Sequence, residues 1–420
     1  MLDIIVSILS NPAFILGIIA LVGLVALKKS SSDIIKGTLK TILGFLILNA
    51  GADIIVNALI PFSQMFTEAF NLSGIVAEDN SLVAAVQQFL GKETALIMVF
   101  AFIINVILAR ITPWKYIFLT GHMMFSFAGT MAIVLDQMGF SGVPLILIGA
   151  LVQGVSMVLF PAISQPFVRK VINGDNVAFG FWGSSWITLS GYVGGLLGNK
   201  EKSSEDVKVP SSLDFLKDMS ILMGIVMIVV YLVTGLVAGN EVVVNLSGGQ
   251  NVVLYSIVQA LTFVAGILVL LQGVRMFLGE IVPAFKGIGQ KIVPGAKPAL
   301  DVPIFYAYAP VGVTIGFLSA MVGGLLVTFI SQWLPVVVLP SVIGLFFMGG
   351  AAGVFGNAAG GRRGAIIGGF FLGFTSSLLI ALAYPLVDVT GYGIQGLWFA
   401  SPDAIIVVVI MRLIGSIFGV

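Results

Sequence analysis

The sequence predicts an all-α polytopic membrane protein with about eleven transmembrane helices and one re-entrant element. The first observation is the composition, since 58% of the 420 residues are hydrophobic and 9% are charged, whereas soluble domains carry roughly 25% charged residues. The second is a series of apolar runs of bilayer length, which favours helices over the shorter alternating strands of a membrane barrel. The third is the placement of Lys and Arg between those runs, which predicts their orientation.

The apolar runs define the predicted segments. In chain order they cover about 11–27, 39–60, 94–109, 116–137, 143–165, 219–238, 252–278, 302–330, 336–357, 365–387 and 403–419. A weaker stretch, Asn176–Gly198, is rich in Gly and Ser. Whether it crosses the membrane must be decided from the charges on either side.

Cationic residues mark the cytoplasmic side. Lys28 and Lys29 follow the first segment, so the N-terminus is predicted outside and the C-terminus inside. The later Lys and Arg residues, Arg275 among them, then fall inside, with Lys92 alone outside. This alternation holds only if 176–198 enters and leaves from the cytoplasm, so we predict that it is re-entrant. The first ten residues contain Asp3 and no basic region, and no cleavable signal peptide is evident.

Two similar stretches suggest an internal repeat. Ile34–Lys40 (IIKGTLK) resembles Ala284–Lys291 (AFKGIGQK), each between two predicted segments. A 5+1+5 arrangement follows, with a first repeat over 1–198, a connecting part over 199–251 and a second repeat over 252–420. Within the connector, Asn199–Asp218 is either a solvated linker or a docking surface.

One acid begins a predicted span. Asp301 starts the run 302–330, which Pro310 interrupts, so a carboxylate lies near a predicted helix break. Such a carboxylate is either a functional group or a helix cap at the water boundary. Before it, Ile281–Ile292 has apolar residues at helical spacing opposite lysines, typical of a helix in the membrane interface.

Other polar residues interrupt the apolar runs. His122, the one histidine, lies within the segment 116–137 and is either a ligand-binding or a packing residue. Asp53 and Asn49 interrupt 39–60 and are interpreted as a polar pair inside the bundle. Glu78, Asp79 and Asn80 are expected to be solvated, unless their loop folds over a binding cavity. The Gly-rich run Gly349–Gly361 is expected to let helices pack closely.

Some chemistry has no residues to perform it in this sequence. The chain has no cysteine, so it offers neither a disulfide nor a thiolate nucleophile. No nucleotide-binding P-loop occurs in it, and no cofactor or metal is expected.

Several motifs together resemble a known family. They are IIKGTLKTILGF, LTGHMMFSFAG, LLGNKEKSSEDVKVP, QGVRMF and FKGIGQKIVPGAKPALD with YAYAP. In this order they resemble the membrane subunit, enzyme IIC, of the ascorbate-type bacterial phosphotransferase system. The resemblance implies a multi-pass homodimer in the bacterial inner membrane, with a core domain and a V-shaped scaffold that move relative to each other like an elevator.

The resemblance also implies site residues. They are His122, Met123, Met124, Phe125 and Ser126 after the TG pair, Asp301, the outer-loop residues Asp79 and Asn80, and Phe181 and Trp182 of the re-entrant stretch. From the residues alone, Met123, Met124 and Phe125 fit packing better than contact. Ser126 stands where the family pattern has a glutamine, and Phe181–Trp182 where it has a polar pair.

The function that follows is transport. The chain is expected to move L-ascorbate or a related sugar acid, which a separate IIB chain, itself phosphorylated by IIA, then phosphorylates. The expected partners are the lipid bilayer, IIA, IIB and a second copy of the chain, and no nucleic acid. The alternative is an ion-coupled secondary transporter that uses Asp301 or Asp53 as its ion site.

Overall fold

The computed structural model describes residues 12–70, 74–206, 218–306 and 308–418. Among these residues, six helices are long and apolar enough to cross a membrane, and the pair α9 (Met219–Ala238) and α10 (Asn240–Ser247), bent by 111°, could form a seventh span. The prediction of a polytopic, mostly helical membrane protein is confirmed. The six helices are α3 (Ser31–Phe70), α5 (Gln87–Ile111), α7 (Gly142–Ile172), α11 (Val252–Ile292), α13 (Pro310–Ile330) and α14 (Val342–Ala383).

Three further helices coincide with predicted segments but are shorter. They are α2 (Pro12–Ala26), α6 (Gly121–Gln137) and α15 (Pro402–Phe418), of 15, 17 and 17 residues. In addition, α14 contains two predicted segments in succession. The number eleven therefore stays a prediction.

A break in the Gly-rich run divides α14. Gly360 and Gly361 have non-helical backbone angles, and the φ of 60° at Gly361 favours glycine. The two halves then pack against each other, because a Cβ atom on Gly356 would lie 2.2 Å from the carbonyl oxygen of Gly364. The predicted packing role of this run is confirmed. The amide of Asn199, just after α8 (Ser184–Leu197), donates to the carbonyl of Gly360 at 2.7 Å.

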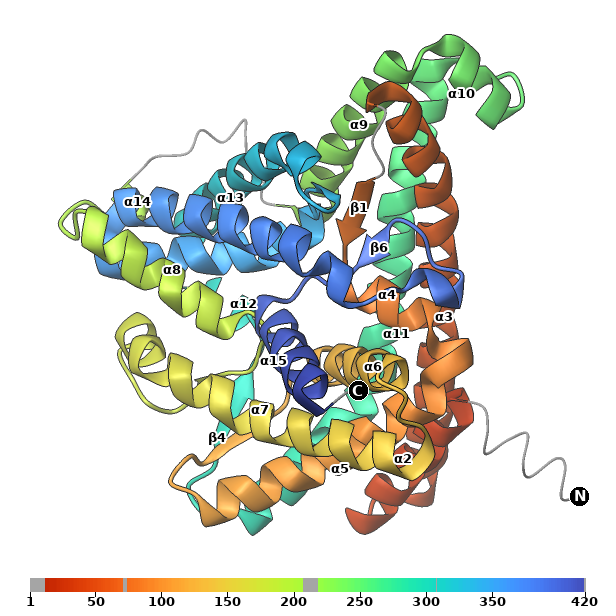
Figure 1. Ribbon diagram of the computed structural model, residues 1–420. Helices are drawn as coiled ribbons and strands as arrows, with labels where there is room; N and C mark the ends of the chain where they lie inside the picture. The colour runs from red at the N-terminus through yellow and green to blue at the C-terminus, as the bar shows by residue number, and fades with distance from the viewer. Residues whose placement is uncertain (1–11, 71–73, 207–217, 307, 419–420) are drawn as a thin grey trace, which may run out of the picture.

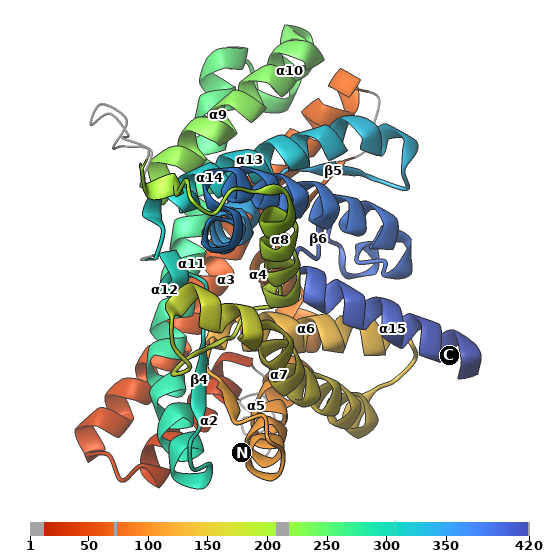
Figure 2. The same ribbon diagram turned by 90° about the vertical axis from the view of Figure 1, so that its left-hand side faces the viewer.

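Two very long helices stand side by side along the height of the molecule (Figure 1 and Figure 2). With 40 and 41 residues, α3 and α11 are each roughly 60 Å long, about twice the hydrocarbon thickness of a bilayer. Small residues bring them together, since a Cβ atom on Gly51 would lie 2.3 Å from the Leu270 nitrogen and one on Gly273 would lie 2.3 Å from the Leu48 nitrogen. The helix predicted over 281–292 is present as the end of α11, not as a separate helix. The side chains of 281–291 lie outside the described part.

Six short strands form two parallel sheets in the described part of the chain, so the expectation of an all-α chain is wrong in this respect. The strands are β1 (Gly74–Ala77), β2 (Tyr116–Phe118), β3 (Ala178–Phe179), β4 (Lys297–Leu300), β5 (Val337–Leu339) and β6 (Leu397–Trp398). One sheet has the order β5-β1-β6 and the other β2-β4-β3. Sequence reasoning missed them because a short apolar strand continues into an apolar helix with no change in hydropathy.

The two sheets are built alike. In each, the central strand comes from one half of the chain and both flanking strands come from the other half. The element order α3-β1-α4-α5-β2-α6 also recurs as α11-β4-α12-α13-β5-α14, where α4 is Asp79–Ala85 and α12 is Pro303–Tyr306. Ile34–Lys40 begins α3 whereas Ala284–Lys291 ends α11, so this sequence similarity does not join equivalent positions. The three-part division of the chain stays a prediction.

One prediction about a polar segment stays open and one about a polar residue is corrected. At the start of the connector, the Glu205 carboxylate accepts from the amides of Val311 and Gly312 at 3.2 and 3.0 Å and so caps α13, which is compatible with either a linker or a docking surface. Residues 207–217 of the connector lie outside the described part. Asp53 is exposed on α3 rather than inside the bundle.

Candidate functional site

A cavity of about 260 Å³ lies where the carboxyl ends of both sheets meet. Nearly all of its lining follows directly after a strand, which is where parallel sheets place ligands. Arg275 of α11 and Phe347 and Met348 of α14 complete the wall. The residues that follow strands are Glu78, Asp79 and Asn80 after β1, His122 and Met123 after β2, Phe181 after β3, Asp301 and Pro303 after β4, Ser341, Ile343 and Gly344 after β5, and Ala400 and Ser401 after β6.

His122 and Asp301 face each other in this cavity. The Nε2 atom of His122 lies 3.6 Å from Oδ2 of Asp301, and the two side chains are 24% and 34% exposed. This separation is too long for a hydrogen bond, so both groups keep hydrogen-bonding capacity for a ligand. His122 is in the first turn of α6 rather than inside a continuous helix, because β2 precedes it.

Asp301 occupies the turn between β4 and α12. Its Oδ1 atom accepts from the amide of Val302 at 2.7 Å, which leaves Oδ2 toward His122. The predicted break at Pro310 is confirmed, since α13 begins at that residue. Between the two, the Tyr306 hydroxyl donates to the Phe347 carbonyl at 3.1 Å and holds α12 against α14.

Glu78, Asp79 and Asn80 are buried, so the expectation of a solvated loop is wrong and the alternative of a loop folded over a cavity describes them. They are 7%, 5% and 8% exposed. Glu78 caps α4 by accepting from the Ser81 amide. Asp79 accepts from the Ala400 amide at 2.8 Å and from the Ser401 hydroxyl, and so joins the ends of β1 and β6. The Oδ1 atom of Asn80 has no hydrogen-bond partner among the described residues.

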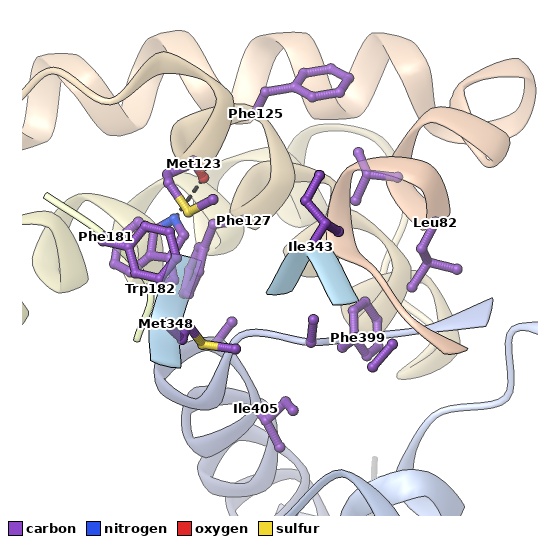
Figure 3. Packing of buried hydrophobic residues seen from close by; sticks show 14 of the residues in the cluster. Leu82, Met123, Phe125, Phe127, Phe181, Trp182, Ile343, Met348, Phe399 and Ile405 are labelled. Carbon is purple, nitrogen blue, oxygen red and sulfur yellow. Dashed lines mark hydrogen bonds between the residues drawn. The ribbon is translucent and has the colours of Figure 1, made fainter. Parts of the chain in front are cut away.

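The aromatic part of the predicted site divides into cavity wall and support. Met123 and Phe181 line the cavity, whereas the Trp182 ring is fully buried behind them (Figure 3). The indole Nε1 of Trp182 donates to the Met123 carbonyl at 2.6 Å, and its ring stacks on Phe118 at 4.7 Å between centroids. Trp182 therefore fixes the backbone at the start of α6 rather than contacting the cavity.

Three other predicted residues do not line the cavity. Met124 is fully buried, and its carbonyl accepts from Gln153 at 2.7 Å. Phe125 points away from the Trp182 group in Figure 3 and meets Phe45 of α3 edge-on. Ser126 is buried, and its hydroxyl donates to the Met123 carbonyl at 3.1 Å.

Comparison with known proteins identifies the family. The sequence profile of the family EIIC-GAT, described as "PTS system sugar-specific permease component", matches residues 7–403. The chain belongs to this permease family. A Mycoplasma pneumoniae protein described as "Ascorbate-specific PTS system EIIC component" is 28% identical over 435 residues, which cover 90% of this chain and 66% of that protein. The chain thus spans about two thirds of the length of that relative.

Membership of the permease family confirms the family resemblance noted in the motifs. It also confirms that the chain is a permease component rather than the enzyme that transfers phosphate. The cavity is then the natural candidate for the sugar site of the permease, because a transporter binds its substrate between its structural halves, at broken helices.

Sequence reasoning missed several polar residues of the permease cavity. Arg275, which the charge pattern assigns to the cytoplasmic side, is also part of the cavity lining. Ser341 and Ser401 line it as well. The sequence did contain a signal for the two serines. Ser341 directly follows the apolar run VVLP and Ser401 directly follows LWFA, just as Asp301 directly follows KPAL.

In the permease, hydrogen-bond donors in the first turn of α8 are already paired with a carboxylate of α15. The buried Asp403 carboxylate accepts from the Ser184 hydroxyl at 3.3 Å, the Ser185 amide at 3.2 Å and the Ser185 hydroxyl. These hydrogen bonds join α8 to α15.

The electrostatics of the cavity combine both signs. Three helices of more than two turns, α6, α14 and α15, begin at its wall, and helix N-termini favour negative charge. Arg275 adds a cationic group, and the carboxylates of Asp79 and Asp301 add strong acceptors. Within the described residues, no group of three or more His, Asp or Glu side chains could hold a metal ion. The cavity can therefore hold a small ligand with several hydroxyls and one anionic group.

Proposed function

We propose that the chain is the EIIC permease that moves L-ascorbate or a closely related sugar acid across the cell membrane, for phosphorylation on the cytoplasmic side by a separate IIB chain. The observation that carries this proposal is the His122–Asp301 pair with Arg275 in one small cavity of a PTS permease. The 28% identical relative, described as ascorbate-specific, supports the choice of substrate.

The size and chemistry of the cavity support a sugar acid. About 260 Å³ is smaller than the roughly 300–1,000 Å³ of sites for drug-sized ligands and is suited to a monosaccharide. The Asp301 carboxylate would accept from sugar hydroxyls, and each charge-assisted bond contributes ~1.5–3 kcal/mol. Arg275 and the N-terminus of α6 would hold the acidic group of the substrate. The Asn80 Oδ1 atom would accept one further hydroxyl.

The phosphate would reach the substrate through partner chains. The chain has no cysteine, so the phosphocysteine step belongs to IIB, which IIA phosphorylates in turn. Arg362 and Arg363 lie at the break in α14, and the Arg362 amide donates to the carbonyl of Lys202 at 2.7 Å. We propose this basic corner as the cytoplasmic docking surface for IIB.

The membrane arrangement is part of the same proposal. Eleven spans result if the short helices α2, α6 and α15 cross, α9 with α10 crosses and α14 crosses twice; the N-terminus is then outside and the C-terminus inside. The exposed Asp53 in the middle of α3 supports a homodimer, because a carboxylate at bilayer depth is costly unless protein covers it. The long α3–α11 pair would form the V-shaped scaffold, against which the core with the two sheets moves.

Uptake into membrane vesicles tests the proposal. Vesicles containing this chain and loaded with phosphoenolpyruvate, the general PTS proteins, IIA and IIB should accumulate phosphorylated ascorbate, and omission of IIB should abolish accumulation. The alternative is an ion-coupled secondary transporter, which the His122–Asp301 pair could serve as a proton site. Accumulation of unmodified substrate that requires a pH or sodium gradient, and not IIB, would establish that alternative.

A further inference from the structure

A second and larger cavity, which shares no lining residue with the candidate sugar site, opens between α2 and α5. Its volume is about 520 Å³, and Ile292 at the end of α11 closes one side of it. One wall comes from Ile18, Val22 and Gly23 of α2, and the other from residues of α5 between Val99 and Ile111. Every lining residue except Arg110 is apolar.

The length of this groove matches one leaflet of a bilayer. On α5 it extends from Val99 to Ile111, which is about 18 Å along the helix axis. Half of a hydrocarbon core of about 30 Å is close to that length. The groove is open to the surroundings, since Val22 and Ile107 are 61% and 51% exposed. An acyl chain lying in the groove would cover these exposed apolar side chains along its whole length.

The Arg110 end of the groove has the features of a membrane–water boundary. Arg110 lies in the last turn of α5, and the Lys115 ammonium donates to the Arg110 carbonyl at 2.9 Å. Trp114 between them is 44% exposed. Tryptophan and basic residues are the groups that anchor a membrane protein at the headgroup level. No carboxylate in the described part of the chain forms an ion pair with Arg110 or Lys115.

We propose that this groove binds one anionic phospholipid, with an acyl chain along α2 and α5 and the phosphate held by Arg110 and Lys115. The two cations and the one-leaflet length argue for a lipid, because a helix of a second chain would continue across both leaflets. Since α2 packs on α3 and α5 packs on α7, the lipid connects the long-helix part of the molecule to the part that carries the cavity wall.

Native mass spectrometry of the protein released from nanodiscs tests this proposal. The nanodiscs contain equal amounts of phosphatidylglycerol and phosphatidylcholine, and the measurement is the number and type of lipids retained per chain. The wild type should retain phosphatidylglycerol in preference. The double variant Arg110→Gln with Lys115→Gln should reduce this retention at least fivefold, and Ile107→Trp should reduce retention of both lipids by filling the groove. The control variant, Arg362→Gln with Arg363→Gln, removes two exposed cations elsewhere and should retain as much phosphatidylglycerol as the wild type.

Each of the other outcomes overturns the proposal. Equal retention of the two lipids by the wild type would mean that the groove holds bulk lipid without recognition. Equal loss of lipid in the double variant and the control would mean that the cations act nonspecifically. A change in the dimer fraction of Ile107→Trp without a change in lipid would make a second copy of the chain the occupant. If the double variant does not fold, as judged by thermal unfolding in detergent, Lys115→Gln alone provides the same comparison.

Discussion

The Nε2 atom of His122 lies 3.6 Å from the Oδ2 atom of Asp301, although the two residues belong to opposite halves of the chain. Each follows a strand of the sheet β2-β4-β3, in which β4 pairs with β2. Strand pairing therefore brings the two side chains together. This arrangement leads to predictions in which the two residues act on one ligand.

The first prediction concerns this pair. Asp301→Asn keeps the shape of the side chain and removes its charge, so ascorbate binding should weaken roughly ten- to a hundredfold, about 1.4–2.8 kcal/mol. His122→Ala should weaken binding without changing thermal stability. Isothermal titration of the single and double variants measures their coupling, which should be at least about 0.5 kcal/mol because the groups share one ligand. Asp136→Asn, at the other end of α6, is the matched control. Normal binding by Asp301→Asn with altered pH dependence of transport would instead indicate a proton site.

The second prediction concerns Arg275, which is not among the site residues that the sequence motifs imply. Arg275→Gln removes the cation of the cavity wall, so affinity for a sugar acid should fall about tenfold or more, while a neutral polyol of similar size should be affected less than threefold. Competition binding with the two ligands measures this difference. Arg363→Gln, at the break in α14, should leave both affinities unchanged. An equal loss for both ligands would make Arg275 a structural residue.

The third prediction concerns the support behind the cavity. Trp182→Phe keeps the aromatic packing and removes one of the donors to the buried Met123 carbonyl, which keeps its hydrogen bond from Ser126, so the loss should cost about 0.5–1.5 kcal/mol of stability. The melting temperature in detergent should fall, whereas the affinity for the ligand should change less than threefold. Trp333→Phe provides the control, because Trp333 is 77% exposed. A large loss of affinity at unchanged stability would place Trp182 in the ligand site itself.

The fourth prediction is a dependence of stability on pH. Asp175, between α7 and β3, bonds Lys297 at 2.6 Å and Arg169 at 2.9 Å, and these hydrogen bonds hold the pKa of its carboxyl below the ordinary value of 3.8. A lowered folded-state pKa gives stability that is present above pH 4 and is lost as the pH falls below the ordinary value. Asp175 is 45% exposed, so each pair contributes only about 0.2–1 kcal/mol.

Thermal unfolding between pH 6 and pH 3 measures this contribution. Asp175→Asn should unfold at a lower temperature than the wild type at pH 6, and the difference should shrink toward pH 3. Asp33→Asn, at the exposed start of α3, controls for the general effect of losing a carboxylate. A constant difference across the pH range would contradict the ion-pair explanation.

The fifth prediction concerns orientation in the membrane. Because the chain has no cysteine, one introduced cysteine is a unique label. Lys170→Cys and Lys202→Cys flank the stretch 176–198, and both should react only from the cytoplasmic side if this stretch is re-entrant. Lys92→Cys should react only from outside. Reaction of the two flanking positions from opposite sides would show that 176–198 crosses, and every later segment would then be reversed.

The sequence alone determined that this chain is a polytopic helical membrane protein. Long apolar runs have few alternatives in a bilayer, because backbone groups there must be bonded within the segment. Local chemistry also predicted the helix break at Pro310 and the close packing at Gly349–Gly361. Proline lacks an amide hydrogen and glycine lacks a side chain, and both effects act on the immediate neighbours. The acid of the proposed site was found in the same way, because a carboxylate stands out against apolar surroundings.

Only the tertiary structure decided the sheets and what they bring together. Strands of two to four residues are too short to be recognised from the sequence pattern. Each is stable only beside a partner strand from the other half of the chain. That pairing buries Asp79 and Asn80, which resemble loop residues in the sequence, and sets His122 opposite Asp301. The fold also makes Arg275 of α11 part of the cavity wall. Hydropathy records how readily a residue leaves water, whereas the neighbours it meets there depend on contacts between distant parts of the chain.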